Sequence, residues 1–101
     1  MKYTIKFTTQ FKKDIKKCKK QGKDLDKLFA VIEILAKGEN LDLKYKDHCL
    51  SGNYKSCREC HIEPDWLFIY EIIDDVLVLF AIEVEVTLSF SRYTLTPNNA
   101  L

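Results

Sequence analysis

Residues 47–70 read DHCLSGNYKSCRECHIEPDWLFIY and contain both histidines of the chain and its only tryptophan. Within them a small-residue turn follows the first histidine, an alternating run carries the second, and Pro64 fixes φ and interrupts regular strand pairing. A turn, a strand and the entry to the next strand thus follow one another closely. We expect this geometry to bring His48, His61 and Asp65 to one site.

The segments around this stretch predict a series of antiparallel strands. Alternation in residues 54–62 places Cys57, Glu59 and His61 on one face and Arg58, Cys60 and Ile62 on the other. Residues 66–73 are apolar on both sides, typical of a central strand, and the next two aspartates supply a tight turn. Residues 76–90 keep every even position apolar, but such a strand is unusually long, so its second half either extends past the sheet or folds back as an edge.

The N-terminal half predicts a strand followed by a helical hairpin. Tyr3, Ile5 and Phe7 alternate with polar residues, as in a strand with one buried face. Thr8 or Thr9 can cap a first helix that ends at Gly22, with Phe11, Ile15 and Cys18 facing inward. Asp24 can cap a second helix that ends at Gly38, with Leu25, Leu28, Phe29, Ile32 and Leu35 facing inward. Residues 39–53 then form a long connection that carries His48 towards the sheet.

These elements predict an α+β fold: an N-terminal strand, a helical hairpin, and an antiparallel meander of about three strands, with the helices on one sheet face and the functional site on the other. At 101 residues, 47% hydrophobic and 31% charged, the chain is typical of one soluble domain. We expect that domain to span residues 1–92 and residues 93–101 to form a flexible tail. The longest apolar run, residues 76–82, is too short to cross a membrane, and we expect a cytoplasmic protein.

The charge of the chain is unevenly distributed. Ten lysines and three aspartates give the first 27 residues a net charge of +7, so the remainder carries −6. Such a basic end suits an anionic partner, most simply nucleic acid, because lysines that neutralise phosphates release counterions. A solvated, lysine-rich helix face explains the same pattern, and charge alone does not separate the two interpretations.

The Cys57-Arg58-Glu59-Cys60 spacing is compatible with half a zinc site or with a redox pair. On a strand, however, residues three apart point to opposite faces, so the two thiols cannot readily share a metal or a disulfide. We therefore expect neither a metal nor a cofactor, and we expect Cys57 and Cys60 to be unbridged.

Three short motifs in this region resemble one known family. They are H-x-L-x-G from His48, R-E-C-H-I from Arg58 and P-D-W-L-x-I-Y from Pro64. Together they resemble the YafQ branch of the RelE-like toxins, over roughly residues 1–80. The resemblance implies a RelE-like microbial ribonuclease-type fold and a toxin-type endoribonuclease that cleaves mRNA in the ribosomal A site. It also implies a cognate antitoxin protein as partner and no cofactor.

The resemblance also implies roles for individual residues. His48, His61 and Asp65 occupy catalytic positions of the family, and Trp66 and Arg58 are expected to bind substrate, with packing as the alternative role for Trp66. Histidine suits the chemistry, because a ribonuclease without metal needs a base and an acid around the scissile phosphate, and imidazole serves as either near neutral pH. From composition alone, a histidine in a turn or at a strand end is more often a hydrogen-bonded structural residue.

The C-terminal segment departs from the family pattern. The family ends in R-x-G-x-H-x-x-L-F, whereas this chain has Ile82 and Val86 near the arginine and histidine positions, with Glu83 and Glu85 between them. Read one base over from codon 82, the gene could encode R-S-G-S-H-S-E-L-F and a stop, so we hypothesise a frameshift. The expected consequence is impaired cleavage with antitoxin or ribosome binding retained. The new apolar stripe could pair two copies into a homodimer. A third hypothesis for the function is a small RNA-binding module that is unrelated to toxins.

Overall fold

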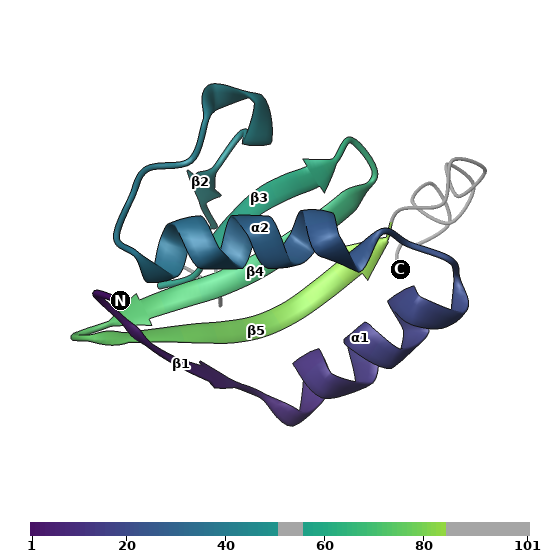
Figure 1. The fold of residues 1–101 in the computed structure, drawn as a ribbon, viewed down its shortest axis with the longest axis horizontal. Coiled ribbons are helices and arrows are strands. Elements are labelled where there is room, and N and C mark those ends of the chain that lie inside the picture. The colour runs from purple at the N-terminus through teal and green to yellow at the C-terminus, as the bar shows by residue number, and fades with distance from the viewer. Residues whose placement is uncertain (51–55, 85–101) are drawn as a thin grey trace.

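A five-stranded sheet with two helices on one face forms the protein (Figure 1). The computed structural model describes residues 1–50 and 56–84. Along the chain the elements are β1 (Thr4–Phe7), α1 (Thr9–Lys20), α2 (Leu25–Ala36), the short 3-10 helix η1 (Leu43–Tyr45), β2 (His48–Cys49), β3 (Arg58–Glu63), β4 (Trp66–Ile73) and β5 (Val76–Val84). The predicted α+β class, with a helical hairpin before a meander, is confirmed.

The sheet has the strand order β1-β5-β4-β3-β2. Strands β2 to β5 pair antiparallel with their neighbours, while β1 pairs parallel with β5 at the opposite edge. The sequence predicted the β3-β4-β5 meander but neither the two-residue strand β2 nor the place of β1. Residues 85–90 of the predicted long strand, the predicted tail 93–101 and the predicted start of β3 at residue 54 lie outside the described residues.

Side chains at the ends of both helices act as the sequence predicted. The Thr8 hydroxyl accepts a hydrogen bond from the Phe11 N–H at 3.0 Å, and the Asp24 carboxylate accepts one from the Asp26 N–H at 3.1 Å. Gly22 and Gly38 follow the helices with φ of 74° and 80°, a conformation that favours glycine. The hairpin is therefore set by local sequence.

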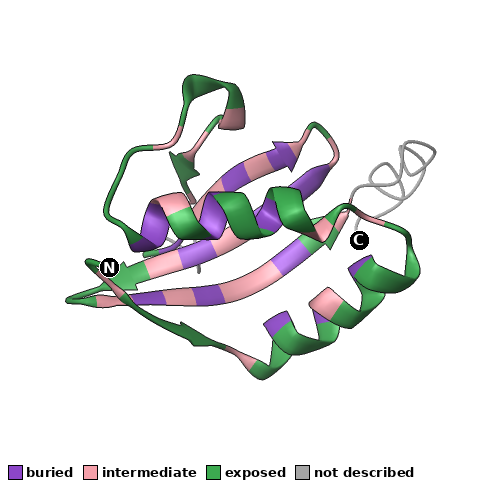
Figure 2. Cartoon of the chain, in the orientation of Figure 1, coloured by how far each residue is buried: buried purple, intermediate pink, exposed green. Residues whose placement is uncertain are grey.

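The core lies between the helices and the face of the sheet that they cover (Figure 2). Alternate residues of the central strands supply it, with Trp66, Phe68 and Tyr70 of β4 all less than 2% exposed. Leu28 and Val31 of α2 pack against them and are fully buried. Since side chains alternate across a strand, the intervening residues of β3, β4 and β5 lie on the other face, which we call the open face.

Two predictions about burial are wrong. Ile5 and Phe7 of β1 are 39% and 56% exposed, because an edge strand with one neighbour is covered less than a central one. Phe29 of α2 is 48% exposed, and Val31 and Ala36 are buried instead. The inward stripe of α2 is thus rotated relative to the predicted one.

Helix α1 also closes the edge of β5 beyond the end of β1. The Thr8 hydroxyl donates to the Phe80 carbonyl at 2.6 Å, and the buried Asp14 carboxylate accepts from the Ile82 N–H at 2.9 Å and from Gln10 Nε2 at 2.8 Å. These bonds satisfy an edge that would otherwise present unpaired backbone groups. The role of Asp14 was not predicted.

Within the described ranges, no helix is long and apolar enough to span a membrane.

Candidate functional site

The pairing of β2 with β3 brings three polar side chains together on the open face. His48 is the register partner of Glu59, and its Nε2 lies 3.2 Å from Glu59 Oε1. The rings of His48 and His61 have centroids 6.2 Å apart. One nitrogen or oxygen atom from each of the three residues lies within 4.8 Å of the others. We call His48, Glu59 and His61 the open-face cluster.

The alternation of β3 explains why this cluster faces away from the helices. Cys60 and Ile62 point into the core, where they are 0% and 7% exposed. Glu59 and His61 therefore point to the open face, away from the helices, as the alternation predicted. The His48 side chain is half-exposed, whereas that of Glu59 is largely covered. A ligand can therefore reach the cluster from one side.

Two backbone carbonyls orient the imidazole rings. His48 Nδ1 donates to the Lys46 carbonyl at 2.7 Å, and His61 Nδ1 donates to the Pro64 carbonyl at 3.2 Å. Because a carbonyl oxygen only accepts, Nδ1 carries the proton in both rings, which leaves Nε2 as the atom that exchanges a proton. The imidazolium form of His48 can in addition donate from Nε2 to Glu59.

The segment before His48 is held in place from both sides. Lys46 has a left-handed backbone, with φ of 50° and ψ of 42°, an uncommon conformation for a side chain other than glycine or asparagine. On the covered face of the sheet, the Asp47 carboxylate accepts from the Tyr70 hydroxyl at 2.8 and 2.9 Å and from Arg58 Nε at 3.1 Å. These contacts fix the backbone from which His48 projects.

The same contacts shift the ionisation of the residues behind the sheet. Burial and then the hydrogen bond to Asp47 raise the pKa of Tyr70 well above its usual value of 10. Burial lowers the pKa of Arg58, but the hydrogen bond to Asp47, the charge of that carboxylate and the contact with Tyr70 together outweigh burial and leave the pKa raised. A neutral tyrosine and a charged arginine thus both stabilise the carboxylate of Asp47.

The structure brings together two of the three predicted catalytic residues. His48 and His61 are neighbours, as predicted. Asp65 lies half-buried in the turn between β3 and β4, and no hydrogen bond or ion pair joins its carboxylate to another residue in the described part of the chain. Glu59 is the residue that sequence reasoning missed as a site member, although its place on the histidine face of the strand was visible in the alternation.

The two predicted substrate-binding residues lie on the covered face of the sheet, away from the open-face cluster. Trp66 is 0% exposed and packs in the core beneath the helices, so it cannot stack on a nucleobase, and its role is the alternative one of packing. Arg58 alternates with Glu59 and so lies on the covered face, where it is paired with Asp47 and donates to Cys49 Sγ at 2.8 Å. The prediction of substrate contact is therefore wrong for Trp66, whereas for Arg58, whose side chain is 39% exposed, it stays a prediction.

Cys57 and Cys60 point apart, as the strand geometry predicted. Cys60 lies in the core, whereas Cys57 Sγ approaches Glu71 Oε1 at 4.0 Å from the other face. Burial raises the pKa of both thiols, that of Cys60 to about 12. Both cysteines are free thiols, and the absence of metal and redox chemistry stays a prediction.

The open-face cluster has the donor set of a metal site. Two imidazole nitrogens and a carboxylate oxygen are ligands that zinc and related divalent ions accept. A metal would use the Nε2 lone pairs that proton transfer also needs, so the two roles exclude each other at any one time. The geometry alone permits either.

A cavity of about 460 Å³ adjoins the cluster on the open face. Glu59 forms one wall, and Leu50, Ile69, Ala81 and Glu83 line it towards β5.

Comparisons with known proteins agree with this architecture. The family model described as "Bacterial toxin of type II toxin-antitoxin system, YafQ" matches residues 3–87. The mRNA interferase toxin YafQ of Escherichia coli strain K12 is 39% identical over 74 residues, which cover 72% of this chain and 80% of that protein.

Two solved structures are similar to the fold. The crystal structure of YafQ from E. coli strain BL21(DE3) has a TM-score of 0.78 and 34% identity, covering 85% of this chain and 97% of that chain. The crystal structure of the E. coli DinJ-YafQ complex has a TM-score of 0.76 and 35% identity, covering 81% and 92% of the two chains.

Proposed function

This chain belongs to the YafQ family of toxins of type II toxin–antitoxin systems, and from this premise we propose that it is an endoribonuclease that cleaves messenger RNA and is neutralised by a cognate antitoxin. The open-face cluster carries the proposal. It offers two imidazoles with their Nδ1 atoms held by carbonyls, and a carboxylate, in one accessible place. These are the groups that RNA cleavage without metal requires.

In the proposed reaction, the 2′-hydroxyl of the RNA attacks the adjacent phosphorus. His61 Nε2 removes the hydroxyl proton as the P–O2′ bond forms, and the imidazolium of His48 gives its Nε2 proton to the departing 5′-oxygen. The products are a 2′,3′-cyclic phosphate and a 5′-hydroxyl, so one proton enters and one leaves the protein. In the imidazolium form, His48 Nε2 donates to Glu59 Oε1, which lies 3.2 Å away.

Asp65 stays in the proposed site. Pro64 and Asp65 form this turn, and the Pro64 carbonyl holds His61, so the Asp65 carboxylate is close in sequence to a catalytic group. A substrate hydroxyl or base edge is the partner that such a carboxylate accepts from.

Within the described residues, no arginine side chain is available to support the transition state. Arg58 is the only arginine before Arg92, and it is engaged by Asp47 on the covered face. Ile82, near the position of the family's arginine, is buried in the core, and Val86 lies outside the described residues. Losing such a donor typically costs 10²-fold or more in rate. We therefore also propose slow cleavage; the second candidate is a toxin-fold protein that binds antitoxin or ribosome with little cleavage.

The remaining expectations follow from the same proposal. The substrate is mRNA in the ribosomal A site, and the location is the cytoplasm, where translating ribosomes are found. One domain of residues 1–92 would carry both the nuclease and the antitoxin-binding surfaces. The proposed homodimer through the C-terminal strand depends on residues after Val84, outside those described.

The direct test compares this chain with a version whose reading frame is restored from codon 82. The gene is sequenced around that codon, and ribosome-dependent mRNA cleavage and growth arrest are measured for both proteins. The proposal predicts detectable but slow cleavage by the present chain and cleavage roughly 10²-fold faster or more after restoration. Equal, strong cleavage by both would show that the altered tail does not impair the enzyme. Absence of cleavage by both would overturn the nuclease assignment.

A further inference from the structure

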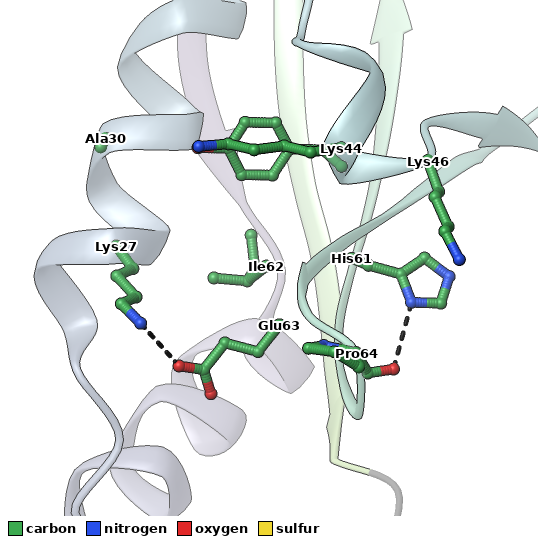
Figure 3. A pocket seen from close by; sticks show the side chains of 9 residues that line it. Lys27, Ala30, Lys44, Lys46, His61, Ile62, Glu63 and Pro64 are labelled. Carbon is green, nitrogen blue, oxygen red and sulfur yellow. Dashed lines mark hydrogen bonds and ion pairs between the residues drawn. The ribbon is translucent and has the colours of Figure 1, made fainter.

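A second cavity, of about 480 Å³, lies between α2, η1 and the end of β3 (Figure 3). Three lysines line it: Lys27 from α2, and Lys44 and Lys46 from η1 and the residue after it. The only acidic residue in its lining, Glu63, is already paired with Lys27 at 2.8 Å. The cavity therefore has an excess of positive charge that no lining residue neutralises.

The rest of the lining is mainly apolar. Ala30, Ile62 and Pro64 contribute aliphatic surface, and Tyr45 contributes an aromatic ring, with Lys44 Nζ 5.2 Å from its centroid. Pockets of this volume accept ligands of nucleotide size. Cationic groups beside an apolar and aromatic surface are what single-stranded RNA requires, since ammonium groups neutralise phosphates while bases pack on apolar or aromatic surface.

This cavity is joined to the open-face cluster through shared residues. His61 forms part of its wall, and in Figure 3 the side chains of Lys46 and His61 lie on the side of β3 away from α2. The carbonyls that hold the two histidines belong to Lys46 and Pro64, both of which line the cavity. When one phosphate of an RNA chain lies at His61, the neighbouring nucleotide therefore reaches this cavity.

We propose that this cavity is a nucleotide subsite of the RNA substrate, in which Lys44 and Lys46 contact the phosphate next to the scissile one and the base lies against Tyr45. The proposal rests on the proposed nuclease function for the identity of the ligand. RNA is favoured over an acidic protein segment because the cavity shares His61 with the cluster.

The test uses the full chain and a labelled single-stranded RNA oligonucleotide whose 2′-hydroxyls are methylated, so that it binds but is not cleaved. Affinity is measured by fluorescence anisotropy over a series of salt concentrations. The variant Lys44→Gln/Lys46→Asn removes two charges, and asparagine tolerates the left-handed backbone at position 46. The matched control, Lys13→Gln/Lys16→Gln, removes two charges from the exposed side of α1.

The cavity variant is expected to bind the RNA roughly tenfold or more weakly, with the salt dependence of log K reduced by about 0.7 for each lysine that contacts a phosphate. The control is expected to lose clearly less. Equal losses in both variants would mean a general effect of charge and would overturn the subsite. Unchanged RNA affinity with weakened binding to the antitoxin would overturn it in favour of a protein contact.

The outcome is separable from the fate of the nuclease assignment. RNA binding that depends on Lys44 and Lys46 in a protein without cleavage activity would keep the subsite and remove the nuclease. Cleavage that requires His48 and His61, combined with RNA affinity that is indifferent to the two lysines, would do the reverse.

Discussion

The two faces of the sheet are made by the same strands and behave in opposite ways. On β3, Cys60 and Ile62 enter a closed apolar core, while Glu59 and His61, their immediate neighbours, meet His48 on the open face. The covered face supplies the core, and the proposed cleavage site lies on the open face. Substitutions on the two faces should therefore separate loss of folding from loss of function.

The largest loss of stability is expected from Phe68→Ala on the covered face. Phe68 is fully buried, with ring centroids 6.0 Å from Phe11 and 5.5 Å from Tyr70. Its truncation should lower the free energy of unfolding by about 3–5 kcal/mol, as removal of a buried aromatic ring does. Urea denaturation measures this, with Glu59→Gln on the open face as control. A loss below about 1 kcal/mol would contradict the division between the faces.

A smaller loss of stability is expected from Tyr70→Phe. Tyr70 lies on the covered face and contacts Asp47, the residue that precedes His48 of the open-face cluster. The variant removes the hydroxyl that donates to the Asp47 carboxylate and should cost about 1–3 kcal/mol, because that carboxylate loses a partner in a partly buried place. Tyr3→Phe is the matched control. Equal stability of the two variants would show that the Asp47 contact contributes nothing.

The difference in stability between the parent and Tyr70→Phe should also depend on pH. Burial raises the pKa of Tyr70 in the folded chain above its usual value of 10, so folding favours the neutral hydroxyl. Its contribution is complete below pH 10 and is lost as the pH rises through the raised value. The stability difference between the parent and Tyr70→Phe should therefore shrink above pH 10, and a difference that grows there would contradict this assignment.

The sequence was sufficient wherever one local rule decides the structure. Thr8 and Asp24 cap the helices because their side chains accept from nearby N–H groups, and period-two alternation alone assigns Cys60 to the core and His61 to the opposite face. The same rules predict that His48 and His61 lie near one another.

Contacts between distant segments were beyond the sequence. Glu59 joins the histidines only because β2 pairs with β3 in one register, and Asp14 is buried only because it meets the Ile82 N–H across the fold. Trp66 was expected at the substrate by motif context, but the pleat of β4 directs it into the core. A motif identifies a family position, whereas the strand face decides what that side chain can touch.

The central claim is that the open face, and not the core, carries RNA cleavage, and the variants His48→Gln and His61→Gln test it most directly. Single-turnover cleavage of ribosome-bound mRNA is measured with urea denaturation, in this chain and in the frame-restored chain. We predict that cleavage falls by about 10²–10⁴-fold for each variant, since each removes a proton donor or acceptor. Stability should change by less than about 1 kcal/mol, because both rings lie outside the core. Cleavage at the parent rate by both variants, in both backgrounds, would contradict the claim.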